Sequence, residues 1–474
     1  MNHAAIVPSH LFALTLLCIL AGLNTAKSQV IDKQPPNFII IFADDLGYGD
    51  LSVYGHPTIH TPNLDQMAQE GQKWTNFYAG ASVCTPSRAA LLTGRLPVRS
   101  GMTSNKNRVL FPDSKNGLPA SEFTLAEQLK TAGYRTACIG KWHLGHKEQY
   151  LPTNNGFDYY FGIPYSNDMD MESDHAYWGY WEQNDDSIKT EHFNVPLMRN
   201  TETIERPANQ NTITGRYADE AITFIKKNKD TPFFVYLAHN LPHIPLFASE
   251  AFIGTSKRGL YGDVVEEIDH GVGKILATLK AEGLAENTIV VFTSDNGPWL
   301  AFKKNGGSAG LLRAGKGSTW EGGMREPAIF WGPGMVKPGL VTDLGATMDL
   351  FTTFSKMAGV TIPNDRIIDG VDLSETLLKL KPSPRKSMFY YRGTELFAIR
   401  SGDYKAHFFT EGAYGQFGER ERHEPPLLFD VNHDPSEQFD IAAQYPAIIA
   451  EINALAARHQ AKLLKGKDQL ANRE

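Results

Sequence analysis

The sequence predicts an α/β fold: a large, mainly parallel β-sheet covered by helices, followed by a small C-terminal α+β domain with an antiparallel sheet and one helix. Short continuous apolar runs, typical of buried parallel strands, recur along the chain. Helical patterns separate these runs. After about Pro382 the pattern changes to short strand-like pieces between Gly-containing turns.

The predicted elements follow from apolar runs and helix boundary signals. The central strands are predicted at residues 37–43, 135–140, 232–238 and 288–293. A helix over 63–70 is opened by Thr61-Pro62 and closed by Gly71, and a second over 124–132 is closed by Gly133. The longest helix is predicted over 262–282. The C-terminal strands are predicted at 387–391, 396–400, 404–409 and 427–431, with a final helix from 446 to about 464.

The chain is expected to have three parts, a signal peptide (1–28), a catalytic domain (29–382) and a C-terminal antiparallel-sheet domain (383–474). Residues 11–22 form an apolar run too short to span a bilayer, and small residues surround Lys27 at a plausible cleavage point. No Lys or Arg precedes this run, so an uncleaved membrane anchor is the alternative. A lipoprotein on Cys18 is a weaker one, because Leu17 stands where a small residue is expected.

Composition narrows the location and the partners. The mature chain would keep only Cys84 and Cys138, and it contains no Asn-x-Ser/Thr acceptor. Both facts suit the periplasm or exterior of a bacterium better than a eukaryotic secretory route. With the signal peptide, they predict an exported protein, for which no stable membrane span is expected. The formal net charge is −7 and no long Lys/Arg run occurs, which argues against a nucleic-acid partner.

Polar residues follow the predicted strands at the point where each strand ends. Ligands of parallel sheets bind beyond the carboxyl ends of the strands, so these residues are expected to form one site. Lys141 and His143 are two residues apart and, in an extended stretch, would point to the same side. The residues after the four strands are Asp44 and Asp45, Lys141 and His143, His239 and His243, and Asp295 and Asn296.

Four of these residues offer hard oxygen ligands. Asp44, Asp45, Asp295 and Asn296 suit Ca²⁺ or Mg²⁺ better than zinc. An Asp-Asp pair alone is more often a turn or a helix cap, which is the alternative interpretation.

The segment Cys84-Thr-Pro-Ser-Arg-Ala-Ala-Leu-Leu-Thr-Gly-Arg95 contains a candidate nucleophile. Pro86 suits the first turn of a helix that runs through Leu92 and ends near Gly94. Cys84 would then lie at a helix N-terminus, which favours negative charge, and Arg88 could hold an anion beside it. The residues alone allow either a thiolate nucleophile or a buried cysteine in a helix cap, with or without a disulfide to Cys138.

This segment resembles the signature of the type I sulfatases, in which the cysteine is oxidised to formylglycine (3-oxoalanine). The resemblance extends from Asn37 to about Asp440 and is strongest with the arylsulfatase A and N-acetylgalactosamine-6-sulfatase branch. It implies the alkaline-phosphatase-like sulfatase fold and a sulfuric ester hydrolase activity. Four further motifs carry it, at residues 140–145 (GKWHLG), 293–297 (TSDNG), 321–327 (EGGMREP) and 389–393 (FYYRG).

The resemblance also implies roles for individual residues. Formylglycine at position 84 would be the nucleophile as a hydrated aldehyde, made by a formylglycine-generating enzyme or an anaerobic maturase. Lys141 and Lys316 would bind the sulfate, His143 would be the base that opens the hemiacetal, and His243 would protonate the leaving group. One Ca²⁺ would be held by Asp44, Asp45, the residue at Cys84, Asp295 and Asn296. Arg88 completes the implied catalytic set, and Ser166 and His239 are candidate substrate contacts.

The expected substrate is a sulfate monoester, either an aryl sulfate or a sulfated carbohydrate of the galactose or N-acetylgalactosamine type. Residues 168–181 and 299–312 are candidate sugar-binding segments, although core packing is the commoner use of Trp and Tyr. Two other functions remain open. One is a phosphate or phosphonate ester hydrolase of a related fold, and the other is a non-catalytic protein that binds sulfated glycans and keeps Cys84 as a thiol.

Overall fold

The predicted α/β fold is confirmed by the computed structural model, which describes residues 1, 35–171 and 188–474. The predicted signal peptide lies outside the described residues except for Met1, as does most of the candidate sugar-binding segment 168–181. Over the described ranges, no helix combines the length and the apolar character needed to cross a membrane.

A ten-stranded mixed sheet forms the centre of residues 35–474. Five adjacent strands, β8, β1, β7, β3 and β4, run parallel, whereas β9 is antiparallel to both of its neighbours and β5 is antiparallel to β4 and β6. In spatial order the strands are β10 (Gly339–Ala346), β2 (Gln72–Tyr78), β9 (Arg325–Trp331), β8 (Thr288–Ser294), β1 (Asn37–Ala43), β7 (Phe233–Ala238), β3 (Arg135–Gly140), β4 (Tyr159–Gly162), β5 (Leu197–Arg199) and β6 (Glu202–Glu205).

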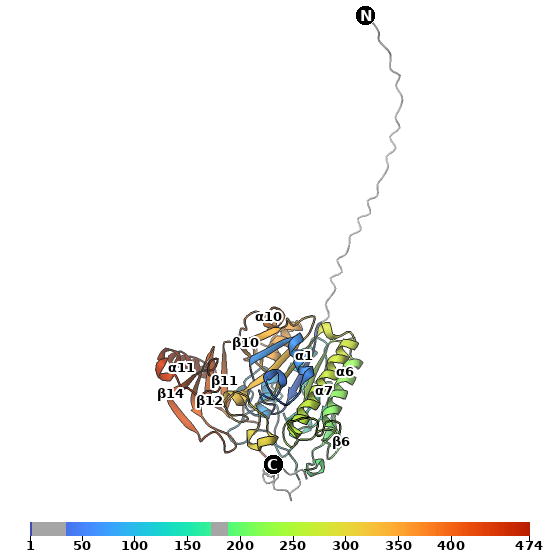
Figure 1. Ribbon diagram of the computed structural model, residues 1–474, viewed down its shortest axis with the longest axis horizontal. Helices are drawn as coiled ribbons and strands as arrows, with labels where there is room; N and C mark the ends of the chain where they lie inside the picture. Colours follow the sequence, from blue (N-terminus) through green and yellow to red (C-terminus); the bar gives the residue numbers. More distant parts are fainter. Residues whose placement is uncertain (2–34, 172–187) are drawn as a thin grey trace. The chain divides into compact units, whose positions relative to one another are not determined.

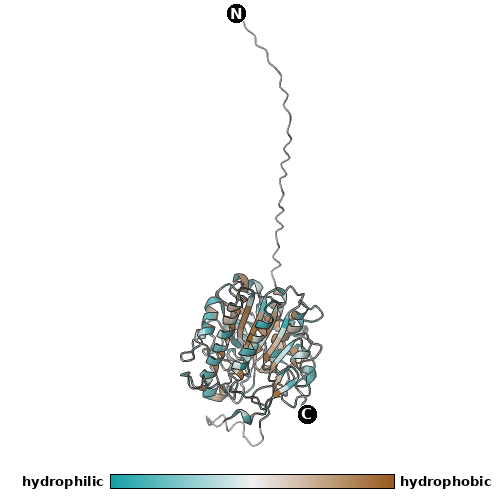
Figure 2. Ribbon diagram, turned by 90° about the vertical axis from the view of Figure 1, so that its right-hand side faces the viewer, coloured by the Kyte–Doolittle hydropathy of each residue, from teal (hydrophilic) through white to brown (hydrophobic). Residues whose placement is uncertain are grey.

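Helices cover both faces of this sheet (Figure 1). Along β1, Ile39 and Ile41 face one apolar core, and Phe38 and Ile40 face the other. Because both faces of the strand are buried, its sequence is continuously apolar rather than alternating. The apolar strands lie between helices with hydrophilic outer faces (Figure 2). On the first core pack α1 (Pro62–Glu70), α6 (Ile213–Lys227) and α7 (Leu260–Ala281), and on the second pack α2 (Cys84–Thr93), α4 (Leu125–Lys130), α9 (Asp349–Met357) and α10 (Ser374–Lys379).

Local sequence signals set several helix ends. Thr124 caps α4 through a reciprocal capping box with Glu127, so the helix starts one residue later than predicted. Gly94 ends α2 in a left-handed conformation, with φ of 67°. Two further α-helices of the described residues are short: α3 (Pro97–Ser100) and α8 (Glu321–Met324).

The C-terminal sheet is antiparallel, as the sequence predicted. Its strands lie in chain order, and α11 (Pro446–Ala461) packs on the same core. That core also contains Tyr78, Ala90 and Met348 from the N-terminal part of the chain, so the two sheets share apolar packing. The strands are β11 (Ser387–Arg392), β12 (Glu395–Ser401), β13 (Tyr404–Thr410) and β14 (Glu421–Asp430).

A buried ion network also joins the two sheets. Lys405 Nζ in β13 lies 2.9 Å from Glu321 Oε1 and 3.0 Å from Glu437 Oε1, and all three side chains are fully buried. The second Glu437 oxygen accepts a hydrogen bond from the backbone N–H of Glu321, at 2.7 Å. Lys405 is therefore the cation that the two buried carboxylates share, in addition to Arg325 and Arg400 near Glu321 and His407 beside Glu437.

Lys405→Met is expected to destabilise the protein by about 3 kcal/mol, because it leaves two carboxylates buried beside each other without their common cation. Urea unfolding monitored by fluorescence would measure this loss. Lys379→Met removes an exposed ion pair with Glu375 and should leave the unfolding midpoint unchanged. Equal stability of the two variants would show that the buried network does not contribute to the free energy of unfolding.

His459 in α11 should make stability depend on pH. Its ring stacks on Phe389 and is hydrogen-bonded to the Tyr391 hydroxyl at 2.8 Å. Burial, with a smaller effect of Arg99, lowers the pKa of His459 to about 4. An unfolded histidine titrates near pH ~6.5, so protons bind the unfolded chain first. Stability should therefore be complete above pH ~6.5 and fall as the pH is lowered toward 4.

His459→Gln is expected to lose less stability than the parent protein between pH 7 and pH 4, as measured by the thermal unfolding midpoint at each pH. His433→Gln is the control, because Asp430 raises the pKa of this exposed histidine instead of lowering it. Parallel midpoint curves for His459→Gln and the parent would contradict the assignment.

Candidate active site

The polar residues predicted to meet at the strand ends do lie together. Strands β8, β1, β7 and β3 are adjacent and parallel, so the residues after their carboxyl ends share one edge of the sheet. Asp44 and Asp45 follow β1, Lys141 follows β3, His243 lies five residues beyond β7, and Asp295 follows β8. This edge is the centre of the candidate site.

Asp44 lies between two cations. Its Oδ2 is 2.6 Å from Lys141 Nζ and 3.4 Å from an Arg88 nitrogen, and all three side chains are fully buried. Burial by itself would raise the pKa of Asp44, but the charges of Lys141 and Arg88 hold it well below its usual range. Asp44 is therefore ionised at any physiological pH.

Asp45 connects the other half of the site. Its Oδ2 lies 2.7 Å from Lys316 Nζ, and its Oδ1 accepts a 2.7 Å hydrogen bond from the Asn296 amide. The backbone of Asp45 has a φ of 61°, which turns the chain sharply after Asp44. Its backbone N–H donates to Asp295 Oδ1 at 3.1 Å.

Arg88 holds two neighbouring residues of the site in position. Its Nε and one terminal nitrogen donate to Asp295 Oδ2 at 3.1 and 2.8 Å, and the other terminal nitrogen donates to the Lys141 carbonyl. Burial and the neighbouring Asp44 carboxylate raise the pKa of Asp295 to about 7. Arg88 does not line the cavity, so its observed contacts fix Asp295 and Lys141 rather than an anion beside Cys84.

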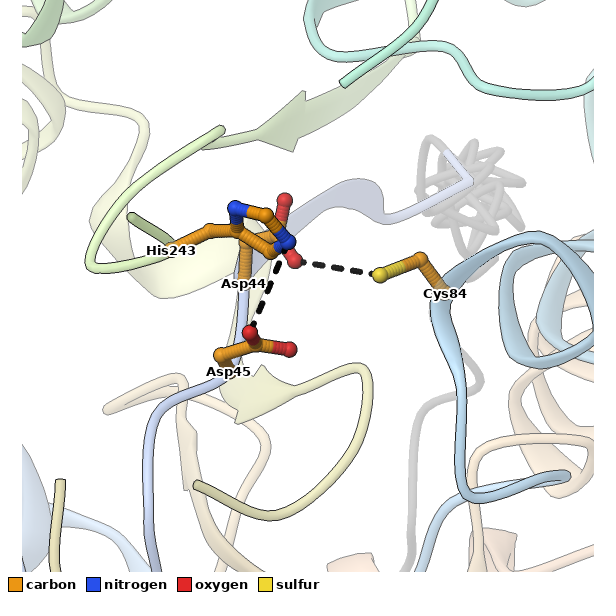
Figure 3. A group of neighbouring side chains, drawn as sticks. All are labelled: Asp44, Asp45, Cys84 and His243. Atoms are coloured by element: carbon orange, nitrogen blue, oxygen red, sulfur yellow. Dashed lines mark hydrogen bonds and ion pairs between the residues drawn. The ribbon is translucent and has the colours of Figure 1, made fainter. Parts of the chain in front are cut away.

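Cys84 is the first residue of α2 and is 2% exposed. Its Sγ points at Asp44 and lies 3.4 Å from Oδ1 (Figure 3). Burial and the Asp44 carboxylate raise the pKa of the thiol well above its ordinary value, in spite of the helix N-terminus. Cys84 and Cys138 are both free and buried, so the disulfide alternative is not realised.

The two histidines each present one ring nitrogen to the site. His143 Nε2 donates to the Leu110 carbonyl at 2.9 Å, so the neutral ring keeps its lone pair on Nδ1, which has no hydrogen-bond partner among the described residues. Burial and Lys141 lower the pKa of His143 well below 6.5. His243 Nδ1 donates to the Ile244 carbonyl, and its Nε2 lies 3.6 Å from Asp45 Oδ2.

The expectation of an extended stretch at Lys141 and His143 is wrong, since His143 has a φ of 57°. Both side chains nevertheless reach the site. Lys141 also donates to the Ser166 hydroxyl at 3.0 Å, which brings Ser166 to the cavity wall. His239 does not line the cavity; its ring packs near Tyr217 instead.

The donor set fits a hard divalent cation. One potential ligand atom from each of Asp44, Asp45, Cys84 and His243 lies within 4.8 Å of the others. Asn296 Oδ1 is buried and has no hydrogen-bond partner within the described part of the chain, so it remains available as an oxygen ligand. Carboxylate and amide oxygens suit Ca²⁺ or Mg²⁺, and a cation would relieve the crowding of Asp44, Asp45 and Asp295.

A cavity of about 730 Å³ opens above these groups, within the size range of small-molecule sites. Cys84, His143, Ser166, His243 and Lys316 line its inner end. Sequence reasoning missed much of the outer wall, where Arg108, Tyr414 and Arg473 come from segments without a recognisable motif. Trp299 belongs to the candidate sugar-binding segment 299–312. Its ring centroid lies 4.8 Å from that of Tyr414 and 4.2 Å from Lys316 Nζ.

Known proteins share both the sequence and the fold. Residues 36–360 match the family described as Sulfatase, and residues 383–474 match the C-terminal region of aryl-sulfatase. The chain is 42% identical to arylsulfatase A of Homo sapiens, over 95% of this chain and 90% of that protein. It is also 42% identical to N-acetylgalactosamine-6-sulfatase of Rattus norvegicus, over 96% and 91%. The solved structure of PsFucS1 sulfatase from Pseudoalteromonas sp. has a TM-score of 0.79 and 29% identity, covering 93% of this chain and 92% of that one.

Proposed function

This chain belongs to the sulfatase family and is a sulfuric ester hydrolase, and we propose that it removes sulfate from a sulfated carbohydrate through a formylglycine formed at Cys84. The family resemblance seen in the motifs is confirmed by the matches over residues 36–360 and 383–474. The preference for a galactose or N-acetylgalactosamine sulfate is supported by the 42% identity to N-acetylgalactosamine-6-sulfatase.

One observation carries the mechanism: the Cys84 side chain lies at the inner end of the cavity, against the Asp44 carboxylate. A thiol whose pKa is raised by burial and by a carboxylate is a poor thiolate nucleophile. A hydrated aldehyde at the same position supplies two hydroxyls on one carbon, one to attack sulfur and one whose deprotonation releases sulfate by carbon–oxygen cleavage. This difference favours the modified residue over the thiol.

The surrounding residues have contacts suited to the remaining tasks. Lys141 is paired with Asp44, and Lys316 is paired with Asp45. Both ammonium groups would place positive charge beside the bound sulfate. His143 is fixed by the Leu110 carbonyl with Nδ1 unprotonated, as required of a base. His243 lines the same cavity. Burial and Lys316 lower the pKa of its ring, and a bound sulfate would oppose this shift and favour the protonated ring that a leaving oxygen needs.

We further propose that Asp44, Asp45, Asp295, Asn296 and the residue at position 84 hold one Ca²⁺. The ion would supply positive charge for the sulfate oxygens and lower the pKa of the attacking hydroxyl. The unpartnered Asn296 oxygen and the crowded carboxylates support this ligand set.

Two other expectations remain proposals. The protein is exported, by way of the segment 1–28, to a bacterial periplasm or exterior. A formylglycine-generating enzyme or an anaerobic maturase modifies it, because oxidation of Cys84 needs a separate catalyst.

Tandem mass spectrometry of the peptide that contains Cys84, taken from active protein, tests the mechanism. The aldehyde mass is expected. An unmodified thiol in fully active protein would refute it, and a thiol in inactive protein would favour a glycan-binding role. Turnover of an aryl sulfate should exceed that of the matching aryl phosphate, and the reverse ratio would point to a phosphate or phosphonate ester hydrolase.

A further inference from the structure

A second pocket lies directly beside the active-site cavity. It has a volume of about 400 Å³ and a mainly polar lining. Neighbouring residues in the chain divide between the two spaces: Cys84 and Lys316 line the active-site cavity, whereas Val83 and Gly317 line the second pocket. The segment 106–108 lines both, so it forms a common wall.

The common wall is held in place by Arg108. Its guanidinium stacks on the Tyr414 ring, with Cζ 4.6 Å from the ring centroid. At Gly317, which has a φ of 82°, an added Cβ would lie 3.0 Å from an Arg108 terminal nitrogen, so this glycine leaves room for the arginine. Arg108 is therefore positioned between the Lys316 loop and the second pocket.

The second pocket carries an excess of positive charge. Four cationic side chains line it, Lys106, Arg108, Arg392 and Arg420, against the two carboxylates Glu395 and Glu411. Arg420 pairs with Glu395 at 2.7 Å, and Arg392 pairs with Glu411 at 3.0 Å. Lys106 and Arg108 are the cations that remain in excess. Burial, Arg108 and Arg420 all lower the pKa of Arg392, as expected of cations that repel one another.

We propose that this second pocket binds another anionic group, a sulfate or carboxylate, of the same glycan chain whose sulfate ester is cleaved in the active-site cavity. The inference rests on the proposed function and narrows its substrate class from sulfated carbohydrates in general to a multiply charged oligosaccharide. Guanidinium groups bind sulfate and carboxylate oxygens through paired N–H donors. The shared wall places the two anion sites next to each other along one substrate.

Two variants of one ion pair test this proposal in opposite directions. Arg420→Gln removes a cation that lines only the second pocket, and it should raise KM for a sulfated tetrasaccharide about five- to tenfold. Glu395→Gln removes the carboxylate that competes for Arg420, and it should lower that KM about two- to threefold. If the ion pair had a purely structural role, both substitutions would raise KM.

The controls separate this inference from the proposed function. Arg422→Gln changes an arginine of β14 that faces a different pocket and should leave KM unchanged. An aryl sulfate should be hydrolysed equally by all forms. A tetrasaccharide that carries only the cleaved sulfate should be insensitive to both substitutions at the ion pair.

Three results would overturn the proposal: an unchanged KM in Arg420→Gln, the same change in Arg422→Gln, or an equal effect on the singly charged tetrasaccharide. If the unsubstituted protein hydrolyses no sulfate ester, the proposed function fails instead. Kd values of the tetrasaccharide for the same variants would then still decide whether the second pocket binds anions.

Discussion

Cys84→Ser is expected to lower multiple-turnover hydrolysis of an aryl sulfate by more than about 10⁴-fold, as for the loss of a covalent nucleophile. A serine has one hydroxyl on its β-carbon, so attack on sulfur would give a stable sulfate ester at position 84. The second hydroxyl that would release sulfate by carbon–oxygen cleavage is missing. Steady-state assays measure the loss, and intact mass spectrometry after incubation with substrate should detect an added sulfate.

The cavity should survive this substitution, because Cys84 contributes only a small buried side chain to it. Substrate Kd is therefore expected to change little. Cys138→Ala is the matched control, since Cys138 is also free and buried but lies within β3 and outside the cavity lining. Near-normal turnover by Cys84→Ser, or an equal loss in Cys138→Ala, would refute the proposed mechanism.

Removal of divalent cations with a chelator is expected to lower activity about 100- to 1,000-fold, because a bound metal ion stabilises transition-state charge by several kcal/mol. Activity should return on addition of Ca²⁺, more completely than with Mg²⁺. The thermal unfolding midpoint should rise with Ca²⁺ concentration, since an ion bound at the proposed site would stabilise the native state and relieve repulsion among Asp44, Asp45 and Asp295.

Asn296→Ala provides the matched variant for this experiment. It removes the unpartnered amide oxygen and should weaken Ca²⁺ binding, so that more of the ion is needed for half-maximal activity. Asn167→Ala is the control, as another buried asparagine, which does not line the cavity and whose amide donates to Gln210 and to the Pro245 carbonyl. Full activity of a preparation shown by elemental analysis to contain no divalent metal would contradict the proposed site.

The central strands could be predicted because their sequences are unambiguous. Residues 37–43 and 135–140 are strands over the predicted ranges, since all of their residues except Arg135 are buried and most are apolar. The strand β2 was not predicted, because Gln72–Tyr78 mixes polar and aromatic residues and its pairing with β9 and β10 depends on distant segments. The helix α6 was also missed, although its buried residues recur at helical spacing and offered a periodic signal.

Most inner residues of the site could be predicted because they follow a strand directly, as Asp44 and Asp295 do, or belong to a motif, as Cys84 and Lys316 do. The outer wall could not. Tyr414 and Arg473 reach the cavity only because the C-terminal part of the chain packs back against the strand edge. Arg88 had a clear signal, but its actual partners, Asp295 and the Lys141 carbonyl, depend on the tertiary structure.

The buried network of Glu321, Lys405 and Glu437 has a consequence for how substrate arrives. Opening a hinge between the two sheets would expose their common apolar core and pull Lys405 and Glu437, both in the C-terminal part, away from Glu321. Such an opening is too costly to accompany every turnover. The sheets on either side of the loop that contains Tyr414 should therefore keep their places during turnover, and the opening beside this loop would decide which substrates reach the site.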